Sequence, residues 1–206
     1  MKKYIINKCL RYIKHNTNYN DVKMSEIKYG LEGIYLTITK MVIIFAIAFI
    51  LDIFNEVIIF LLIYNILRLP SFGLHATKSW ICLVSSSIIF IGIPYLCLFL
   101  KIPIIFRSII SSVGILLMFK NAPADTYKRP IVSKKRRNKL KFISTIFTII
   151  YGFCTILIKN DFILNCYLFS IILQNCMIAP TTYKLFKLPY NNYINYIKTH
   201  PNLLFD

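Results

Sequence analysis

Apolar residues occur in long blocks along this 206-residue chain, and short polar stretches separate the blocks. The blocks run over residues 40–54, 56–67, 80–100, 102–119, 142–158 and 162–179. A helix needs about 20 residues, each rising about 1.5 Å, to cross the hydrocarbon core of a bilayer. The third block meets that length, and the three blocks after it approach it. The pattern therefore predicts an all-α, polytopic membrane protein with about six apolar segments.

The first two blocks are short, and the polar residues Asp52, Asn55 and Glu56 interrupt them. We interpret these blocks as two helices joined by a tight turn whose polar tip reaches the far interface of the membrane. One long tilted helix is the alternative. Whether both segments cross the bilayer stays open at this point.

The regions before and after the blocks are polar. Residues 1–39 are basic, but an apolar stripe recurs there at steps of three and four residues: Met24, Ile27, Leu31, Ile34 and Ile38. Such an amphipathic helix either lies on the membrane surface or packs on the membrane domain, and the sequence favours neither. We expect three parts: N-terminal interfacial helices (1–39), a membrane domain (40–179) and a loosely held cytoplasmic tail (180–206).

The composition excludes most classes of soluble protein. Apolar residues make up 57% of the chain, which is more than a soluble domain of this length can bury. In a soluble protein the net charge of +17 would indicate nucleic-acid binding. Here the basic residues stand between apolar blocks, so we interpret them as an orientation signal and expect no nucleic-acid partner.

The positive charges give a consistent orientation. Four stretches hold 22 of the 25 lysines and arginines: 1–40, 68–79, 120–141 and 180–206. The other three, Lys101, Arg107 and Lys159, lie at or near the opposite turns. Because positive loops stay inside the cell, crossings that start from a cytoplasmic N-terminus place all four stretches in the cytoplasm. We therefore predict a multi-pass cell-membrane protein with both termini cytoplasmic.

The six cysteines have neither the spacing of a metal site nor the context of a disulfide framework. The sequence also has no nucleotide-binding loop and no set of metal ligands. We therefore expect no cofactor.

Among the three histidines, His75 has the most unusual surroundings, because His15 and His200 lie in polar termini. It ends the stretch Arg68-Leu69-Pro70-Ser71-Phe72-Gly73-Leu74-His75, and Cys82 follows at the start of the longest apolar block. A thiol and an imidazole are the minimum for cysteine catalysis: the thiolate attacks a carbonyl, and the imidazole takes the thiol proton and later protonates the leaving amine. The helix dipole at the start of a span favours the thiolate.

Spacing limits how this pair can act. Positions seven apart in one regular helix share a face but lie about 10.5 Å apart along the axis. A dyad of His75 and Cys82 therefore requires irregular backbone between them, which the nearby Gly73 favours. Arg68, Ser71 and the Gly73 backbone are candidates for orienting groups or for oxyanion support. The alternative is a small apolar cysteine and a hydrogen-bonded interfacial histidine.

A second polar stretch, 120–131, forms a loop in which Pro123 and Pro130 exclude regular helix. A basic run follows it: Lys134, Lys135, Arg136 and Arg137. The run either binds an acidic peptide or anionic lipid, or only sets membrane topology. Charge alone favours the topological role.

The two stretches together resemble the accessory gene regulator protein B family (AgrB), the membrane peptidases of Gram-positive quorum sensing. The matching residues are Tyr29-Gly30-Leu31-Glu32, Arg68, Gly73, His75-Ala76, Cys82, Ala122-Pro123-Ala124-Asp125-Thr126, Lys128, Pro130-Ile131 and the basic run. The likeness covers about residues 20–185, in the expected order. Many members have Gly-Gly or His-Gly where this chain has Phe72-Gly73, which changes the turn but removes no reactive group.

The resemblance implies a cysteine endopeptidase with Cys82 as the nucleophile and His75 as its general base and acid. Family members cut the C-terminal part from a small precursor peptide, AgrD, and keep the remainder as a thioester on the enzyme cysteine. A cysteine or serine of the peptide then closes a thiolactone or lactone ring, the autoinducing peptide. The resemblance also implies a homodimer and a set of substrate-binding residues: Asp125, Lys128, Arg129, Lys134, Lys135, Arg136 and Arg137.

Two other functions fit the composition. A non-enzymatic carrier or exporter of a small peptide would use Arg107, an ionisable group inside a span. A lipid-binding structural module would use the net positive charge. Replacement of Cys82 separates the enzyme from both, because only the enzyme requires its thiol.

Overall fold

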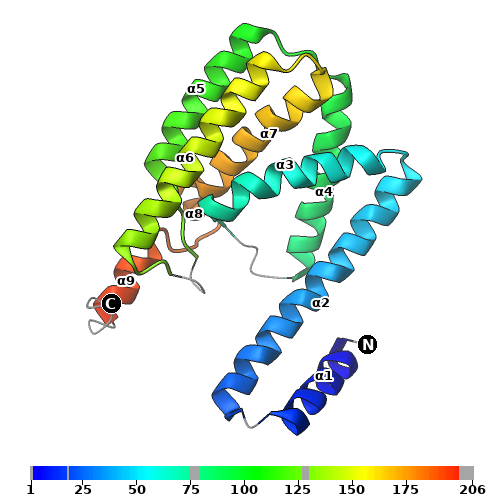
Figure 1. Ribbon diagram of the computed structural model, residues 1–206, viewed down its shortest axis with the longest axis vertical. Coiled ribbons are helices and arrows are strands. Elements are labelled where there is room, and N and C mark those ends of the chain that lie inside the picture. The colour runs from blue at the N-terminus through cyan, green and yellow to red at the C-terminus, as the bar shows by residue number, and fades with distance from the viewer. Residues whose placement is uncertain (1, 18, 75–78, 127–129, 200–206) are drawn as a thin grey trace. The chain divides into compact units, whose positions relative to one another are not determined.

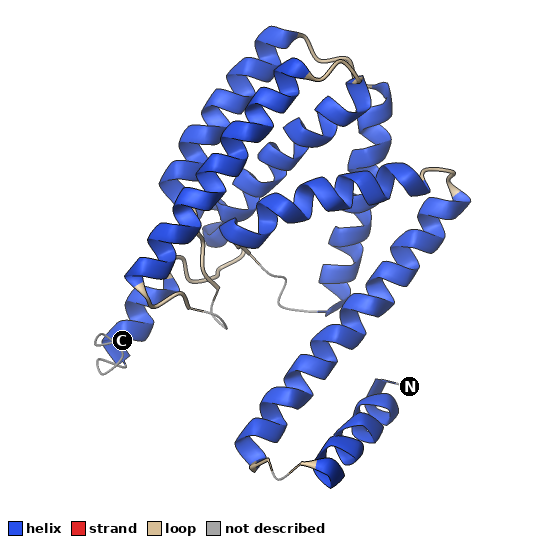
Figure 2. Ribbon diagram, viewed as in Figure 1, coloured by secondary structure: helices blue, strands red, loops and turns tan. Residues whose placement is uncertain are grey.

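The computed structural model describes residues 2–17, 19–74, 79–126 and 130–199, and each named element among them is a helix (Figures 1 and 2). The chain divides into two compact units, the N-terminal unit Met1–Asp52 and the C-terminal unit Ile53–Asp206. The N-terminal unit holds α1 (Lys2–Asn16) and α2 (Asp21–Ile50). The C-terminal unit holds α3 (Phe54–Ser71), α4 (Ser79–Phe99), α5 (Ile104–Asn121), α6 (Lys134–Leu157), α7 (Asp161–Ile178), α8 (Pro180–Leu185) and α9 (Asn192–Thr199).

Six of the described helices, α2 to α7, are long and apolar enough to cross a membrane. This confirms the predicted all-α, polytopic fold, and the protein is a multi-pass membrane protein. The first two apolar blocks form separate helices, since α2 ends at Ile50 and α3 begins at Phe54. Between them, Asp52 adopts a left-handed φ of 55°, which ends regular helix.

In the N-terminal unit, α2 is one continuous helix of 30 residues, about 45 Å long. It runs without a break past residue 39, and no proline interrupts residues 21–50. Asn20 caps its start by accepting a hydrogen bond from the Lys23 N–H at 3.0 Å. Helix α1 packs against α2, and Ile6 of α1 is buried.

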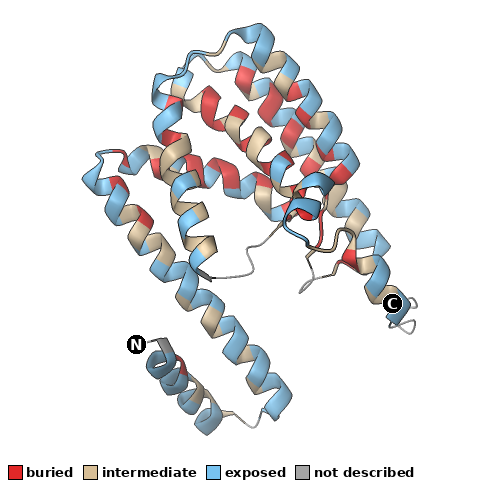
Figure 3. Cartoon of the chain, turned by 180° about the vertical axis from the view of Figure 1, so that it is seen from behind, coloured by how far each residue is buried: buried red, intermediate tan, exposed pale blue. Residues whose placement is uncertain are grey.

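In the C-terminal unit, α7 lies at the centre and packs against α3, α4, α5 and α6. The buried residues gather where these helices face one another (Figure 3). Phe60 and Leu67 of α3, Met118 of α5 and Ile171 of α7 have no exposed surface. A Cβ at Gly114 of α5 would overlap Ile171, so the missing side chain lets the two helices approach closely.

The segment after α7 differs from the loosely held tail expected from the sequence. Its described part, residues 180–199, forms two short helices, and both Tyr183 and Asn192 are buried. The rings of Tyr183 and Tyr190 meet edge to face, with centroids 5.3 Å apart, a favourable aromatic geometry. The polar composition of the segment did not indicate this packing, because two tyrosines and backbone hydrogen bonds hold the segment in place.

Candidate functional site

The two motif stretches meet at the end of the C-terminal unit where α3, α5 and α7 finish. Phe72, just after α3, pairs with Ala124, just after α5, in a parallel bridge. The Gly73 N–H donates to the Ala124 carbonyl at 2.9 Å, and the Ala124 N–H donates to the Ser71 carbonyl at 3.1 Å. Backbone hydrogen bonds therefore join residues that are about 50 positions apart in the chain.

The backbone at the bridge between Phe72 and Ala124 needs a glycine at position 73. Phe72 and Gly73 both have positive φ, 56° and 113°, which L-residues with side chains rarely adopt. A Cβ at Gly73 would lie 2.9 Å from the Met177 carbonyl oxygen and 3.1 Å from Nη1 of Arg68. The next residue, Leu74, donates its N–H to the same Met177 carbonyl at 3.0 Å.

Two side chains hold this segment, and we call them the Arg68–Gln174 clamp. Nη2 of Arg68 donates to the Leu74 carbonyl at 2.7 Å, and its Nη1 lies 3.5 Å from Oε1 of Gln174. Nε2 of Gln174 donates to the Phe72 carbonyl at 2.7 Å. Sequence reasoning singled out Arg68 but missed Gln174. Its signal in the sequence was a neutral amide inside the last apolar block, which also contains Asn165 and Asn175.

The other candidates of the first stretch are placed as follows. Ser71 is fully buried, and its hydroxyl donates to the Leu67 carbonyl at 2.6 Å. Cys82 lies in the first turn of α4 as a free, half-buried thiol. His75, the predicted partner of Cys82, lies outside the described residues.

Asp125 in the second stretch is 2% exposed. Its carboxylate accepts the N–H groups of Asn192 at 3.0 Å and Tyr193 at 2.7 Å, at the start of α9. Burial raises the pKa of this carboxyl, although the hydrogen bonds from Tyr193 and Asn192 oppose the shift. The Tyr183 hydroxyl donates to the Asp125 carbonyl at 3.0 Å. Burial, followed by the nearby Asp125, raises the pKa of this tyrosine.

The basic run is divided between two environments. Lys134, Lys135 and Arg136 are exposed in the first turn of α6, where the helix dipole adds to their positive potential. Arg137 is half-buried and donates to the Ile131 carbonyl at 2.9 Å and to the Val132 carbonyl at 2.8 Å. Its guanidinium also lies 3.8 Å from the ring centre of Tyr193. Lys128 and Arg129 lie outside the described residues.

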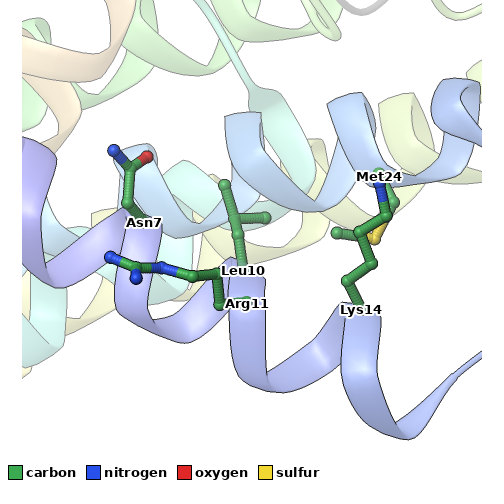
Figure 4. Close-up of a pocket in the computed structure, with 5 residues that line it drawn as sticks. All are labelled: Asn7, Leu10, Arg11, Lys14 and Met24. Atoms are coloured by element: carbon green, nitrogen blue, oxygen red, sulfur yellow. The ribbon is translucent and has the colours of Figure 1, made fainter.

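The N-terminal unit has a shallow hollow of about 360 Å³ between α1 and α2 (Figure 4). Its lining combines polar and apolar side chains: Asn7, Leu10, Arg11, Lys14 and Met24. Across the described parts of both units, no group of three or more histidine, cysteine or acidic side chains could hold a metal ion.

Comparison with known proteins identifies the family. The model of the family described as Accessory gene regulator B matches residues 6–178. The chain belongs to this family. An AgrB-like protein of Clostridium acetobutylicum is 32% identical over 181 residues, which cover 86% of this chain and 85% of that protein. An AgrB-like protein of Listeria monocytogenes is 34% identical over 173 residues, covering 83% and 84% of the two chains.

A relative named accessory gene regulator protein B, from Staphylococcus epidermidis, is 28% identical over 174 residues, covering 82% of this chain and 87% of that protein. No solved structure matches this chain. Family membership gives the protein a role in accessory gene regulation. The family match ends at residue 178, so the contacts of Asp125 with Asn192 and Tyr193 involve chain beyond it.

Proposed function

We propose that this protein is a membrane-embedded cysteine endopeptidase that processes a small AgrD-type quorum-sensing precursor. Cys82 is the nucleophile and His75 the general base and acid. The enzyme releases the C-terminal part of the precursor and retains the N-terminal part as a thioester. A cysteine or serine within that part then closes the thiolactone or lactone ring of the autoinducing peptide.

The observation that supports this best is the hydrogen-bonded backbone immediately before His75. The Arg68–Gln174 clamp, together with Gly73 and Ala124, holds irregular backbone in one arrangement. Such backbone is tolerated at membrane depth only when its polar groups are satisfied within the protein. The chain then leads through His75 to Cys82 in the first turn of α4, where the helix dipole favours a thiolate.

The reaction follows from the two reactive groups. The Cys82 thiolate attacks the scissile carbonyl, the peptide C–N bond breaks, and His75 delivers the thiol proton to the leaving amine. The thioester keeps the acyl group activated, so ring closure needs no ATP. Water must be kept away from the thioester, because hydrolysis competes with cyclisation. The half-buried position of Cys82 supports this requirement.

The supporting residues have roles that follow from their hydrogen bonds. Arg68 bonds Leu74 and Gln174, Ser71 bonds its own helix, and the Gly73 N–H bonds Ala124. We therefore assign Arg68 and Gly73 to holding the loop that precedes His75, and the Ser71 hydroxyl to its own helix. The Ser71 hydroxyl and the Gly73 N–H already have acceptors within the protein. The oxyanion donor is left unassigned.

We propose that the acidic part of the precursor binds the exposed cations Lys134, Lys135 and Arg136, together with Lys128 and Arg129. In this proposal Asp125 and Arg137 act indirectly. Asp125 accepts two N–H groups at the start of α9, and Arg137 binds the carbonyls just before α6 and stacks on Tyr193 of α9. Cations in the first turn of a helix oppose its dipole and destabilise it, so helix stability does not account for three of them there. Charge reversal at the three exposed sites should raise the KM for the precursor.

We also propose that the protein is a homodimer with both termini in the cytoplasm. Cross-linking in lipid vesicles tests the dimer, and a purely monomeric protein at working concentration would exclude it.

Cys9 in α1 is free and exposed, so its labelling reports the side of the membrane on which the N-terminus lies. In whole cells it should resist a membrane-impermeant maleimide and react after lysis.

The experiment for the activity uses purified protein in lipid vesicles and a synthetic precursor encoded beside its gene. Cys82→Ala and His75→Ala should lower the cleavage rate at least about 1,000-fold, because each removes a reacting group. Cys176→Ala, at a free exposed thiol of α7, and His15→Ala, at an exposed site of α1, are the matched controls. Wild-type cleavage by folded Cys82→Ala would exclude Cys82 as the nucleophile. No cleavage by the wild type, together with normal signalling by a Cys82→Ala strain, would favour the carrier, for which charge changes at Arg107 should matter instead.

A further inference from the structure

Gln174 is one of the buried amides of α7. It lies in a helix that is apolar enough to cross a membrane, and it has no exposed surface. A buried amide is costly to desolvate unless its groups are hydrogen-bonded, and an apolar side chain of similar size would pack the same space. The amide chemistry therefore requires an explanation other than filling the core.

The partners of Gln174 supply that explanation. Its Nε2 donates to the Phe72 carbonyl at 2.7 Å, and its Oε1 lies 3.5 Å from Nη1 of Arg68. The other arm of Arg68 donates to the Leu74 carbonyl at 2.7 Å. That carbonyl belongs to the peptide bond that joins Leu74 to His75. Because a peptide unit is planar, a hydrogen bond to its oxygen restricts the orientation of the unit.

The backbone before this peptide group is held by further hydrogen bonds. The Phe72 N–H donates to the Arg68 carbonyl at 3.0 Å, and the Phe72 carbonyl accepts from Gln174. The Leu74 N–H donates to the Met177 carbonyl, and the Leu74 carbonyl accepts from Arg68. Both backbone groups of Phe72 and both of Leu74 are therefore hydrogen-bonded. Two of these four bonds come from the clamp.

We propose that Gln174 is a positioning residue for the reaction, because its amide holds Phe72 and Arg68, and through them the peptide group that leads into His75. This inference rests on the proposed function, in which His75 activates Cys82. Gln174 touches neither the reacting thiol nor the substrate in this account. Its loss should lower the rate of acyl transfer and leave precursor binding unchanged.

Two substitutions separate its donor from its acceptor. Gln174→Met keeps the length of the side chain and removes both polar functions. Gln174→Glu keeps an acceptor for Arg68 and removes the N–H donor to the Phe72 carbonyl. If the hydrogen bond to the Phe72 carbonyl matters, both variants should form the thioester slowly, even though the side chain in Gln174→Glu can still accept from Arg68.

Asn165 is the matched control on the same helix. It is also fully buried, and its Nδ2 donates to the carbonyls of Cys97 at 3.1 Å and Leu100 at 2.8 Å. These carbonyls lie at the end of α4, far along the chain from Cys82 in its first turn. Asn165→Leu therefore removes a comparable buried amide at the opposite end of α7, and it should lower the unfolding midpoint by a few degrees.

The experiment measures three quantities on full-length protein in lipid nanodiscs. They are the single-turnover rate of thioester formation, the KM for the synthetic precursor, and the pH dependence of Cys82 alkylation by iodoacetamide, read by peptide mass spectrometry. Gln174→Met and Gln174→Glu should lower the single-turnover rate about 10- to 100-fold, which is typical of a misplaced catalytic group, and change KM less than about twofold. Their alkylation profile should move towards that of His75→Ala, while Asn165→Leu keeps the wild-type rate and profile.

The outcomes are separable. Wild-type rates and alkylation profiles in both Gln174 variants would overturn the inference. So would equal losses in Gln174→Glu and in Asn165→Leu at matched unfolding midpoints, because the amide would then have only a structural role. If Gln174→Met fails to fold, Gln174→Glu carries the test. Failure of the proposed function has a different signature: Cys82→Ala would cleave the precursor, whatever the Gln174 variants do.

Discussion

The two ends of α7 each carry a buried amide, and the two amides bind different kinds of backbone. Asn165, near the start of the helix, donates to two carbonyls at the end of α4. Gln174, near its end, donates to the carbonyl of Phe72 and lies within reach of Arg68. Both side chains have no exposed surface. Each end of the central helix therefore has a buried amide that donates to the backbone of a neighbouring segment.

The difference lies in the backbone that is held. The last carbonyls of any α-helix lack partners within the helix, so the bonds of Asn165 are helix capping that many folds require. The segment held by Gln174 is irregular, with positive φ at Phe72 and Gly73 and a bridge to Ala124. Sparsely populated backbone persists only where its surroundings impose it, and it is concentrated at functional sites. The comparison assigns stability to one end and positioning to the other.

The largest effect is expected at Gly73. Gly73→Ala puts a Cβ 2.9 Å from the Met177 carbonyl oxygen, at a φ of 113°. We expect a loss of about 1–3 kcal/mol in the free energy of unfolding from backbone strain and nearly complete loss of precursor cleavage. Gly92→Ala in α4 is the control, since nothing lies within 4 Å of its added Cβ. Normal cleavage by Gly73→Ala would mean that the loop geometry is not required.

An intermediate effect is expected at Asp125, and it depends on pH. Burial raises the pKa of this carboxyl in the folded protein above its ordinary value of 3.8. Between 3.8 and the folded pKa, the folded state binds more protons than the unfolded state, so stability falls as the pH rises through that window. Asp125→Asn has no such titration. The stability of the wild type relative to this variant should therefore fall with rising pH above 3.8 and then level off.

Thermal unfolding in nanodiscs at a series of pH values measures this difference. Asp161→Asn is the control, because that carboxyl is exposed in the first turn of α7. A difference between wild type and Asp125→Asn that grows with rising pH would contradict the direction of the shift.

The smallest effect is expected at the other end of the unit. Thr155 of α6 is fully buried, and its hydroxyl lies 3.2 Å from that of Ser111 in α5. Thr155→Val removes this contact but keeps the Thr155 backbone carbonyl, which accepts from Arg107 at 2.8 Å. Interhelical hydrogen bonds in membranes contribute about 0.6 kcal/mol on average, so we expect a loss of that size. Precursor cleavage by Thr155→Val should keep the wild-type rate. A slower reaction would contradict the distinction between the two ends of the C-terminal unit.

The helices were predictable and the contacts between the loops were not. Hydropathy located the spans, because membrane helices need long apolar runs. The pairing of Phe72 with Ala124 uses backbone groups, which every residue has, so side-chain patterns could not indicate it. Gln174 was one amide in an apolar block, and its partner carbonyl is about 100 residues away in the chain.

Asp125 shows a different limit. The resemblance to the family marked it as a candidate that binds substrate. Its burial depends on residues 180–199, whose polar composition predicted a loose tail. In the structure the N–H groups of Asn192 and Tyr193 satisfy the carboxylate. Such a contact is invisible to composition, since it depends on where the chain returns in space.

The central claim is that Cys82 forms a covalent bond with the precursor, and intact-mass spectrometry tests it most directly. Purified protein in lipid is mixed with the synthetic precursor and quenched in acid, which preserves thioesters. The account predicts a mass gain on the wild type equal to the N-terminal precursor fragment, absent from Cys82→Ala and present in Cys176→Ala. Cleaved precursor without any adduct on the wild type, together with cleavage by Cys82→Ala, would contradict it.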